Sequence, residues 1–217
     1  MYKVDLHTHS QASPDGGIRP EQYAQALATE KLDFIAITDH DRIDFALGMQ
    51  KALGNKIIVG QEITTSEGEL IGLYLTKKIE PNQTALKTAH DIHNQGGLVY
   101  VPHPFETVRR GITLEALETI TELVDIVEVH NGRAVFQNFG PKAAVWAKTH
   151  GKTGASSSDA HGYKGLGYSY SIINEPAARG SLVDAVTMTN LAHRRPPLYT
   201  LLYPKLNRFG KNLGIKK

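Results

Sequence analysis

The stretch Asp5-Leu6-His7-Thr8-His9-Ser10 directly follows a short apolar run over residues 2–4 at the start of the chain. In an extended segment, side chains two positions apart point to the same face. His7 and His9 can therefore converge on one point, and Asp5 lies on the same face. Two imidazoles at this spacing, just past a strand, are typical of a metal site. The motif alone leaves a second interpretation open, because surface strands also carry His-x-His by chance.

Further along the chain, other apolar runs also end in polar, titratable side chains. Runs over residues 33–38, 56–60, 98–101 and 124–129 predict buried strands, and residues 153–156 lead into a further polar segment. The segments at their ends are Asp39-His40-Asp41, Gln61-Glu62, Pro102-His103-Pro104, His130-Asn131 and Ser157-Ser158-Asp159-Ala160-His161. Packing explains one buried histidine at a strand end, but it does not explain a series of them.

Helical patterns alternate with these strands, over residues 20–30, 45–53, 82–95, 113–122, 136–150 and 182–192. Residues 69–75 predict a strand that pairs across a turn at 66–68, and residues 168–173 a last strand. The alternation predicts βα units, a mainly parallel sheet and a single α/β barrel. In such a barrel the strands' carboxyl ends lie on one face, where active sites are built, so the polar segments should meet there.

Composition bounds the function further. The 217 residues contain no cysteine, which excludes disulfides, a thiolate nucleophile and sulfur-ligated zinc. No apolar run approaches a membrane span and no signal peptide is visible, so we expect a cytoplasmic protein. The formal charge of +2 hides an asymmetry, because no acidic residue follows Asp184. We therefore predict a barrel domain over residues 1–192 and a basic extension over 193–217. That extension is either solvated or in contact with nucleic acid or an anionic surface.

Taken in order, these segments resemble the PHP (polymerase and histidinol phosphatase) superfamily over roughly residues 1–175. The resemblance implies a distorted (β/α)7 TIM-like barrel that holds two or three divalent metal ions at its mouth. By position, one metal would be held by His7, His9, Glu62 and Asp159. Glu62 would bridge to a second, completed by His103 and His130, and a third would be held by Asp15, His40 and His161.

The donor types agree with this implication independently. Imidazoles and carboxylates without sulfur suit Zn, Mn or Fe. Asp15 has a second interpretation, because Ser13-Pro14-Asp15-Gly16 is also a good turn sequence. Asp39 and Asp41 flank His40 and would orient ligands, although Asp41 suits a surface loop equally well. Histidines outside the motifs are expected at surface or packing positions: His90, His93, His150 and His193.

The chemistry expected is hydrolysis of a phosphate ester by a hydroxide that bridges the metals. His161 or His40 would supply a proton to the leaving group. Arg133, three residues beyond His130, is the first candidate for binding phosphate, with Asn131 as a hydrogen-bond donor. Arg109 and Arg110 come second and Lys164 last. The substrate would be a nucleotide, a small phosphomonoester or an oligonucleotide end.

Two other functions remain open at this point. A metal-dependent amidohydrolase on a similar barrel also begins with His-x-His, but such enzymes often carry a bridging carboxylated lysine, and the strand ends here carry Glu62 instead. A non-catalytic metal-binding module would lack ligands, and none is missing. No Gly-x-Ser-x-Gly elbow, P-loop or Rossmann fingerprint is present.

Overall fold

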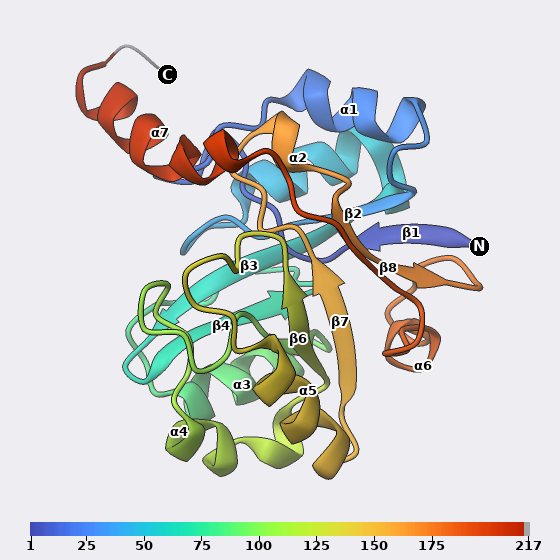
Figure 1. Cartoon of the computed structure of the whole chain (residues 1–217), viewed down its shortest axis with the longest axis vertical. Coiled ribbons are helices and arrows are strands. Elements are labelled where there is room, and N and C mark those ends of the chain that lie inside the picture. The colour runs from blue at the N-terminus through green and yellow to red at the C-terminus, as the bar shows by residue number, and fades with distance from the viewer. Residues whose placement is uncertain (215–217) are drawn as a thin grey trace.

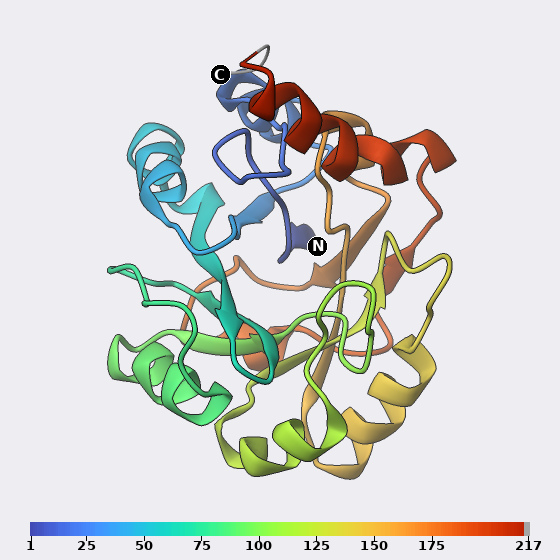
Figure 2. The ribbon, with the colours of Figure 1, turned by 90° about the vertical axis from the view of Figure 1, so that its left-hand side faces the viewer.

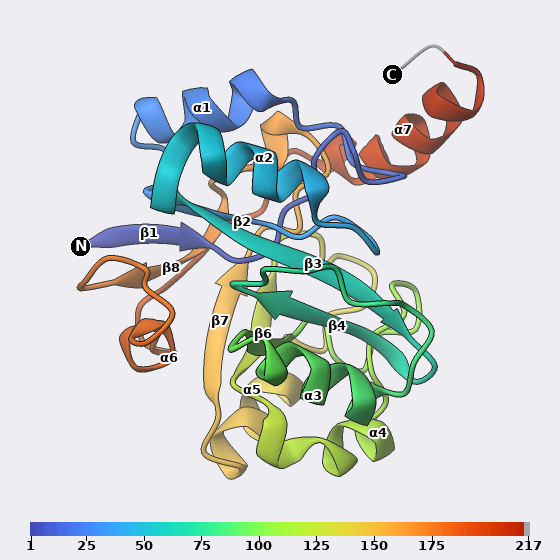
Figure 3. The ribbon, with the colours of Figure 1, turned by 180° about the vertical axis from the view of Figure 1, so that it is seen from behind.

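The computed structural model describes residues 1–214 and contains nine strands in that range. They form one sheet in the order β7-β6-β5-β4-β3-β2-β1-β8-β9. Their bounds are β1 (Tyr2–Asp5), β2 (Phe34–Ile37), β3 (Ile57–Thr65), β4 (Gly68–Leu73), β5 (Leu98–Val101), β6 (Ile126–Asn131), β7 (Thr153–Ser157), β8 (Ser169–Ile173) and β9 (Leu191–His193). The sheet curls into a nearly closed barrel, shown in Figures 1 and 3.

The predicted distorted α/β barrel is confirmed, and its distortion lies in the strand directions. Parallel pairs are β1–β2, β2–β3, β5–β6 and β6–β7, whereas β4 and β8 run antiparallel to both of their neighbours. The predicted pairing across the turn at residues 66–68 is the β3–β4 hairpin. Hydrogen bonds from Asp159 N to His7 O and from His9 N to Ala160 O, both 2.9 Å, join the ends of β1 and β7 and help to close the barrel.

The helices lie outside the strands, as Figure 2 shows. They are α1 (Pro20–Ala28), α2 (Asp44–Leu53), α3 (Ala85–Asn94), α4 (Leu114–Thr119), α5 (Gly140–Thr149), α6 (Leu182–Ala185) and α7 (Tyr203–Asn212). Alternation along β2 explains the layering. Phe34 and Ala36 belong to an apolar cluster inside the barrel, whereas Ile35 and Ile37 pack in the cluster beneath the helices.

The C-terminal part of the chain differs most from the sequence expectation. The helix expected over residues 182–192 ends at Ala185, and β9 then pairs antiparallel with β8. The β-branched residues of the following segment, Val186, Thr187 and Thr189, have low helix propensity, which is consistent with this early end. The chain then reaches α7, which lies beside the loop that follows β1 (Figures 1 and 3). No helix within residues 1–214 is long and apolar enough to cross a bilayer.

Candidate metal centre

Four donor atoms meet beyond the carboxyl ends of β1 and β7, one of them from Glu62 in the interior of β3. His7 Nε2 and His9 Nε2 are 3.1 Å apart. Glu62 Oε2 lies 3.4 Å from His7 Nε2 and 3.2 Å from His9 Nε2, and Asp159 Oδ1 lies 3.6 and 3.5 Å from the same atoms. All four side chains are buried. Adjacent ligands about 2.1 Å from one ion are separated by distances of this order, so the donor set fits a divalent metal.

A second group forms beside the first, around the loop that follows β1. Asp15 Oδ2 is 3.6 Å from His40 Nε2, and Asp15 Oδ1 is 3.5 Å from His161 Nε2. These three side chains and His9 have donor atoms within 4.8 Å of one another. Gly16 allows the loop to fold back, because a Cβ there would lie 2.1 Å from the carbonyl oxygen of Ser10. The structure therefore brings Asp15 to the site and also places it in a turn.

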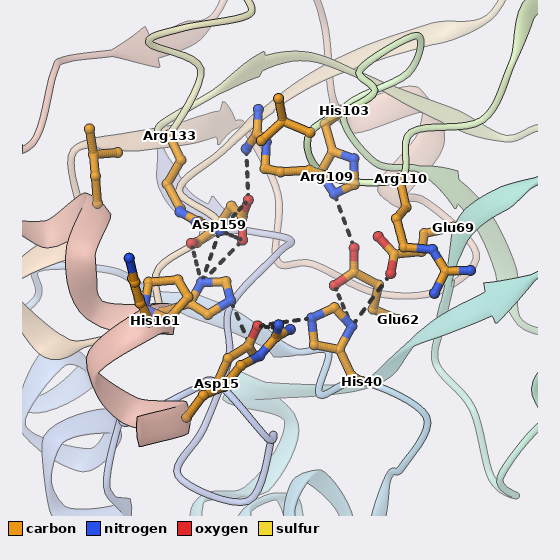
Figure 4. Close-up of a pocket in the computed structure, with 15 residues that line it drawn as sticks. Asp15, His40, Glu62, Glu69, His103, Arg109, Arg110, Arg133, Asp159 and His161 are labelled. Atoms are coloured by element: carbon orange, nitrogen blue, oxygen red, sulfur yellow. Dashed lines mark hydrogen bonds and ion pairs between the residues drawn. The ribbon is translucent and has the colours of Figure 1, made fainter. Parts of the chain in front are cut away.

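Glu62 lies at the centre of the whole arrangement (Figure 4). Besides His7 and His9, its Oε2 lies 3.3 Å from His40 Nδ1, and its Oε1 lies 3.1 Å from His103 Nε2. One carboxylate thus contacts four histidines from three segments. Glu69 of β4, which the sequence reasoning did not select, joins His40 and Glu62 in a further group of donor atoms.

His130 is the one predicted ligand that the structure does not bring to the cluster. A register shift lies between Glu128 and His130 in the pairing of β6 with β7. Such a bulge reverses the side-chain alternation that would otherwise place both residues on one face. The His130 ring instead stacks on His193, with ring centroids 4.7 Å apart, and Asn131 turns inward.

Glu128 has the inward position that was expected for His130. It accepts hydrogen bonds from the candidate metal ligands His7 and His103 and is not a member of any donor group within residues 1–214. Its Oε1 accepts hydrogen bonds from His7 Nδ1 at 3.2 Å and Tyr100 Oη at 2.9 Å. Its Oε2 accepts from the backbone N–H of His103 at 2.7 Å and from Asn131 Nδ2 at 2.8 Å. An acceptor at His7 Nδ1 fixes the tautomer that leaves Nε2 free to bind a metal.

The buried charges are strongly coupled. Burial would raise the pKa of Glu62, but His40 and His7 outweigh it and hold this pKa well below its ordinary value. Burial would lower the pKa of His40, but the charge of Glu62 and the hydrogen bond with Asp15 raise it to about 10. His161 behaves oppositely, since burial and the positive charges of His9 and Arg133 lower its pKa to about 3. His161 is therefore neutral at pH 7, which is the ligating form.

Two of the candidate ligands have left-handed backbone conformations, with φ of 51° at Asp159 and 28° at His103. Such conformations cost a non-glycine residue on the order of 1–3 kcal/mol and are concentrated at functional sites. The surrounding fold must supply this energy to direct both side chains into the cluster.

The arginines divide into two kinds. Arg109 is committed to other side chains, since it donates to Glu106 at 2.6 Å and to Asp159 Oδ2 at 2.8 Å. Arg133 Nη1 lies 3.3 Å from Asp159 Oδ2, and its buried Nε has no hydrogen-bond partner. Arg110 has no side-chain hydrogen bond among those of residues 1–214, although its charge acts on the carboxyl group of Glu69. Lys164 lies apart and lines a smaller second cavity.

These groups line a cavity of about 460 Å³, shown in Figure 4. Its wall includes α7 and the segment before it, which contribute Leu201, Pro204, Lys205 and Arg208. The described part of the basic extension is thus packed against the site. No strong signal in the sequence indicated this contact, because the polar residues of α7 looked like a solvated face.

The remaining histidines make packing or surface contacts. His150 stacks on Trp146, with ring centroids 4.3 Å apart, and His93 Nε2 lies 2.8 Å from Asp125. Asp41, one of the residues expected to orient ligands, accepts a hydrogen bond from the backbone N–H of Thr64 at 2.9 Å.

A barrel with several buried His/Asp/Glu groups that fit a polynuclear metal centre defines a class of metal-binding α/β barrel proteins. Comparison with known proteins identifies the family. The PHP domain model matches residues 5–149, and the chain belongs to this family.

The relatives extend this result. An uncharacterized protein of Methanocaldococcus jannaschii is 34% identical over 173 residues, which cover 77% of this chain and 69% of that protein. The fold is similar to that of a two-domain protein from Bacteroides vulgatus described as containing a predicted PHP-like metal-dependent phosphoesterase. The TM-score is 0.68 at 21% identity, over 95% of this chain and 69% of that one.

A further similarity is to endonuclease Q, whose structure holds a 27-mer duplex substrate with an abasic lesion at the active site. The TM-score is 0.59 at 14% identity, over 87% of this chain and 55% of that one. These structural neighbours show the shared fold.

Proposed function

We propose that this protein is a metal-dependent phosphoesterase that hydrolyses a phosphate ester. The observation that carries the proposal is the position of Glu62, whose two carboxylate oxygens lie 3.1–3.4 Å from nitrogens of His7, His9, His40 and His103. A carboxylate in this position is able to join neighbouring cation sites and reduce the repulsion between them. Clustered divalent ions, when bound, activate water and stabilise charge on a phosphoryl group.

Arg133 is the side chain best placed to bind the phosphoryl group. It lines the cavity with a side chain that is 18% exposed, and its Nη2 makes no hydrogen bond with any of residues 1–214, so part of the guanidinium is available for a charge-assisted hydrogen bond. The bond of its Nη1 with Asp159 ties the guanidinium to the edge of the metal centre. A phosphate oxygen bound by Arg133 is thereby held beside the ligands.

His161 and His40 are assigned different roles, a metal ligand and a proton donor. The pKa of His161 is lowered to about 3, which suits a permanent ligand and does not suit proton donation at pH 7. His40 has a pKa raised to about 10, and its side chain is 18% exposed toward the cavity. We therefore assign proton donation to the leaving group to His40, with the proton held on Nε2 or Nδ1 between the carboxylates of Asp15 and Glu62.

The amidohydrolase alternative is less well supported. Glu62 of β3 lies between the histidines, where a bridging carbamate would be needed, and Lys205, the lysine that lines the cavity within residues 1–214, comes from α7 and makes no ion pair with a donor residue. A non-catalytic module would not need a partly free Arg133 in the cavity wall.

The experiment that tests the proposal measures hydrolysis of p-nitrophenyl phosphate, bis-p-nitrophenyl phosphate and p-nitroacetanilide by the Mn²⁺-loaded protein. Arg133→Met is compared with Arg179→Met, whose arginine is exposed and bonds to the carbonyl oxygen of Gly96. We expect a phosphoester to be cleaved, and Arg133→Met alone to lower kcat/KM by about ten- to a hundredfold. Cleavage of the anilide with no phosphoester turnover would refute the proposal in favour of the amidohydrolase.

A further inference from the structure

Helix α7 is fixed to the metal centre through its polar side chains. Asn207 Nδ2 donates to the carbonyl oxygens of Asp15 at 2.9 Å and His161 at 3.0 Å, both residues of the second donor group. Lys211 Nζ donates to the carbonyl oxygens of Gln11 at 2.7 Å and Gly16 at 2.9 Å. Gly17 lets Asn207 approach, since a Cβ there would lie 2.8 Å from its amide nitrogen. The helix therefore has a defined register on the ligand loop.

This register directs one line of side chains into the cavity. Pro204 and Lys205 lie three and four residues before or after their neighbours on this wall, Leu201 in the preceding turn and Arg208 in α7, and all four line the cavity. Figure 4 shows α7 on one side of the cavity and the loop that carries Arg110 on the other. Two opposite walls of the cavity thus carry positive charge.

The charges of these walls are only partly neutralised. Arg208 Nη2 lies 3.0 Å from Asp15 Oδ2, although the Arg208 side chain is 62% exposed and retains other donors. Lys205 lines the same wall and makes no ion pair or side-chain hydrogen bond with any of residues 1–214. Lys205 lies one turn from Arg208, about 4.5 Å along the helix axis. These donors come from α7 and are separate from Arg133, which follows β6.

The cavity is also larger than one phosphate group requires. Its volume of about 460 Å³ is in the range of pockets that bind whole small molecules. The candidate metal ligands lie between the two positively charged walls, with α7 and its Lys205 and Arg208 on one side and Arg110 on the other.

We propose that Lys205 and Arg208, facing Arg110, form an anion-binding wall that holds a second phosphate of the substrate, distinct from the one that is hydrolysed. The inference rests on the proposed function, because it deepens the description of the same site. The protein then prefers compounds that carry two phosphates, supplied either by a doubly phosphorylated small molecule or by successive phosphates of a nucleic-acid strand. α7 is the element that sets this preference.

The test uses two phosphonates that cannot be hydrolysed, so it does not depend on turnover. Binding of 1,3-propanediphosphonate and of propylphosphonate to the Mn²⁺-loaded full chain is measured by calorimetry. Lys205→Met is compared with Lys148→Met, which removes an exposed lysine from α5, away from the cavity. We expect the wild type to prefer the diphosphonate by about tenfold, and Lys205→Met to lose this preference with propylphosphonate binding unchanged.

Arg208→Met is a second variant and should also lose the preference, with metal content checked because Arg208 contacts Asp15. A wild-type preference retained in Lys205→Met overturns the inference. Absence of phosphoester turnover in the wild type would contradict the proposed function, and the binding result would still stand.

Competition distinguishes the two sources of the second phosphate. Fructose 1,6-bisphosphate and 5′-phosphorylated trithymidylate are each tested for displacement of the diphosphonate, with fructose 6-phosphate as the singly phosphorylated reference. Stronger displacement by either compound supports the anion-binding wall and identifies the source of the second phosphate. If neither compound displaces the diphosphonate better than fructose 6-phosphate does, the inference is overturned.

Discussion

Replacing Glu128 with glutamine tests how the fold prepares His7 for metal binding. The carboxylate accepts from His7 Nδ1 and Tyr100 Oη on one oxygen and from His103 N and Asn131 Nδ2 on the other. A glutamine amide group cannot satisfy both pairs. Its NH2 is tolerated least opposite the fixed N–H of His103, so it should face His7.

An NH2 facing His7 Nδ1 favours the tautomer in which Nδ1 accepts and Nε2 carries the proton. That Nε2 is the atom placed 3.4 Å from Glu62 and 3.6 Å from Asp159, and a proton there blocks metal binding. Loss of such a supporting contact typically lowers metal affinity by about ten- to a hundredfold, equivalent to about 1.4–2.7 kcal/mol. We expect a loss of this size for Glu128→Gln, with hydrolysis restored in part at high metal concentration.

The assay titrates metal-free protein with Zn²⁺ or Mn²⁺ against a chelator of known affinity. Glu115→Gln, which changes an exposed acid in α4, is the control for charge. Circular dichroism establishes that both variants are folded. An unchanged metal affinity in Glu128→Gln would refute the assignment of Glu128 as the residue that orients His7.

Two further predictions concern the donor set. His103→Ala should lose metal and activity, because His103 contacts Glu62, whereas His130→Ala should keep both, because His130 stacks on His193 instead. The metal content of each variant is measured after dialysis, and equal losses of metal in the two variants would contradict the geometry. Metal binding at pH 8 should release protons, because burial would lower the pKa of His7 but the charges of Asp159 and Glu62 hold it well above its ordinary value. Metal affinity should therefore increase as the pH rises above 8, and calorimetry in buffers of different ionisation enthalpy that finds no proton release would contradict the assigned charge state of His7.

Much of the site could be predicted because one physical regularity places it. Parallel strands of a barrel end on the same face, so polar residues after successive apolar runs must meet there. His7, His9, Glu62, Asp159 and His161 were found in this way, since each follows or lies within a strand whose apolar pattern is clear in the sequence.

The structure places His130 outside the donor groups of residues 1–214 for a local reason. Alternation along a regular strand places Glu128 and His130 on the same face, and one bulge between them reverses that relation. A bulge depends on pairing with the neighbouring strand, so no pattern within residues 126–131 reveals it. The same bulge turns Asn131 toward Asp159.

The role of α7 was missed for a different reason. An amphipathic helix normally buries its apolar side. Here Leu206 and Phe209 are more than half exposed, whereas Asn207 is buried against the ligand loop. The basic charge of residues 193–217 indicated an extension that is solvated or in contact with nucleic acid or an anionic surface, and only the tertiary contacts show that its part up to residue 214 forms part of the cavity wall.

The central claim is that Glu62 joins neighbouring metal positions in a centre that hydrolyses phosphoesters. The most direct test combines elemental analysis with hydrolysis of p-nitrophenyl phosphate and bis-p-nitrophenyl phosphate by the Mn²⁺-loaded wild type, Glu62→Ala and Asp159→Ala. The account predicts two or three metal ions per wild-type chain, about two fewer in Glu62→Ala, and no turnover in either variant while the barrel stays folded. Unchanged metal content and activity in Glu62→Ala would contradict it.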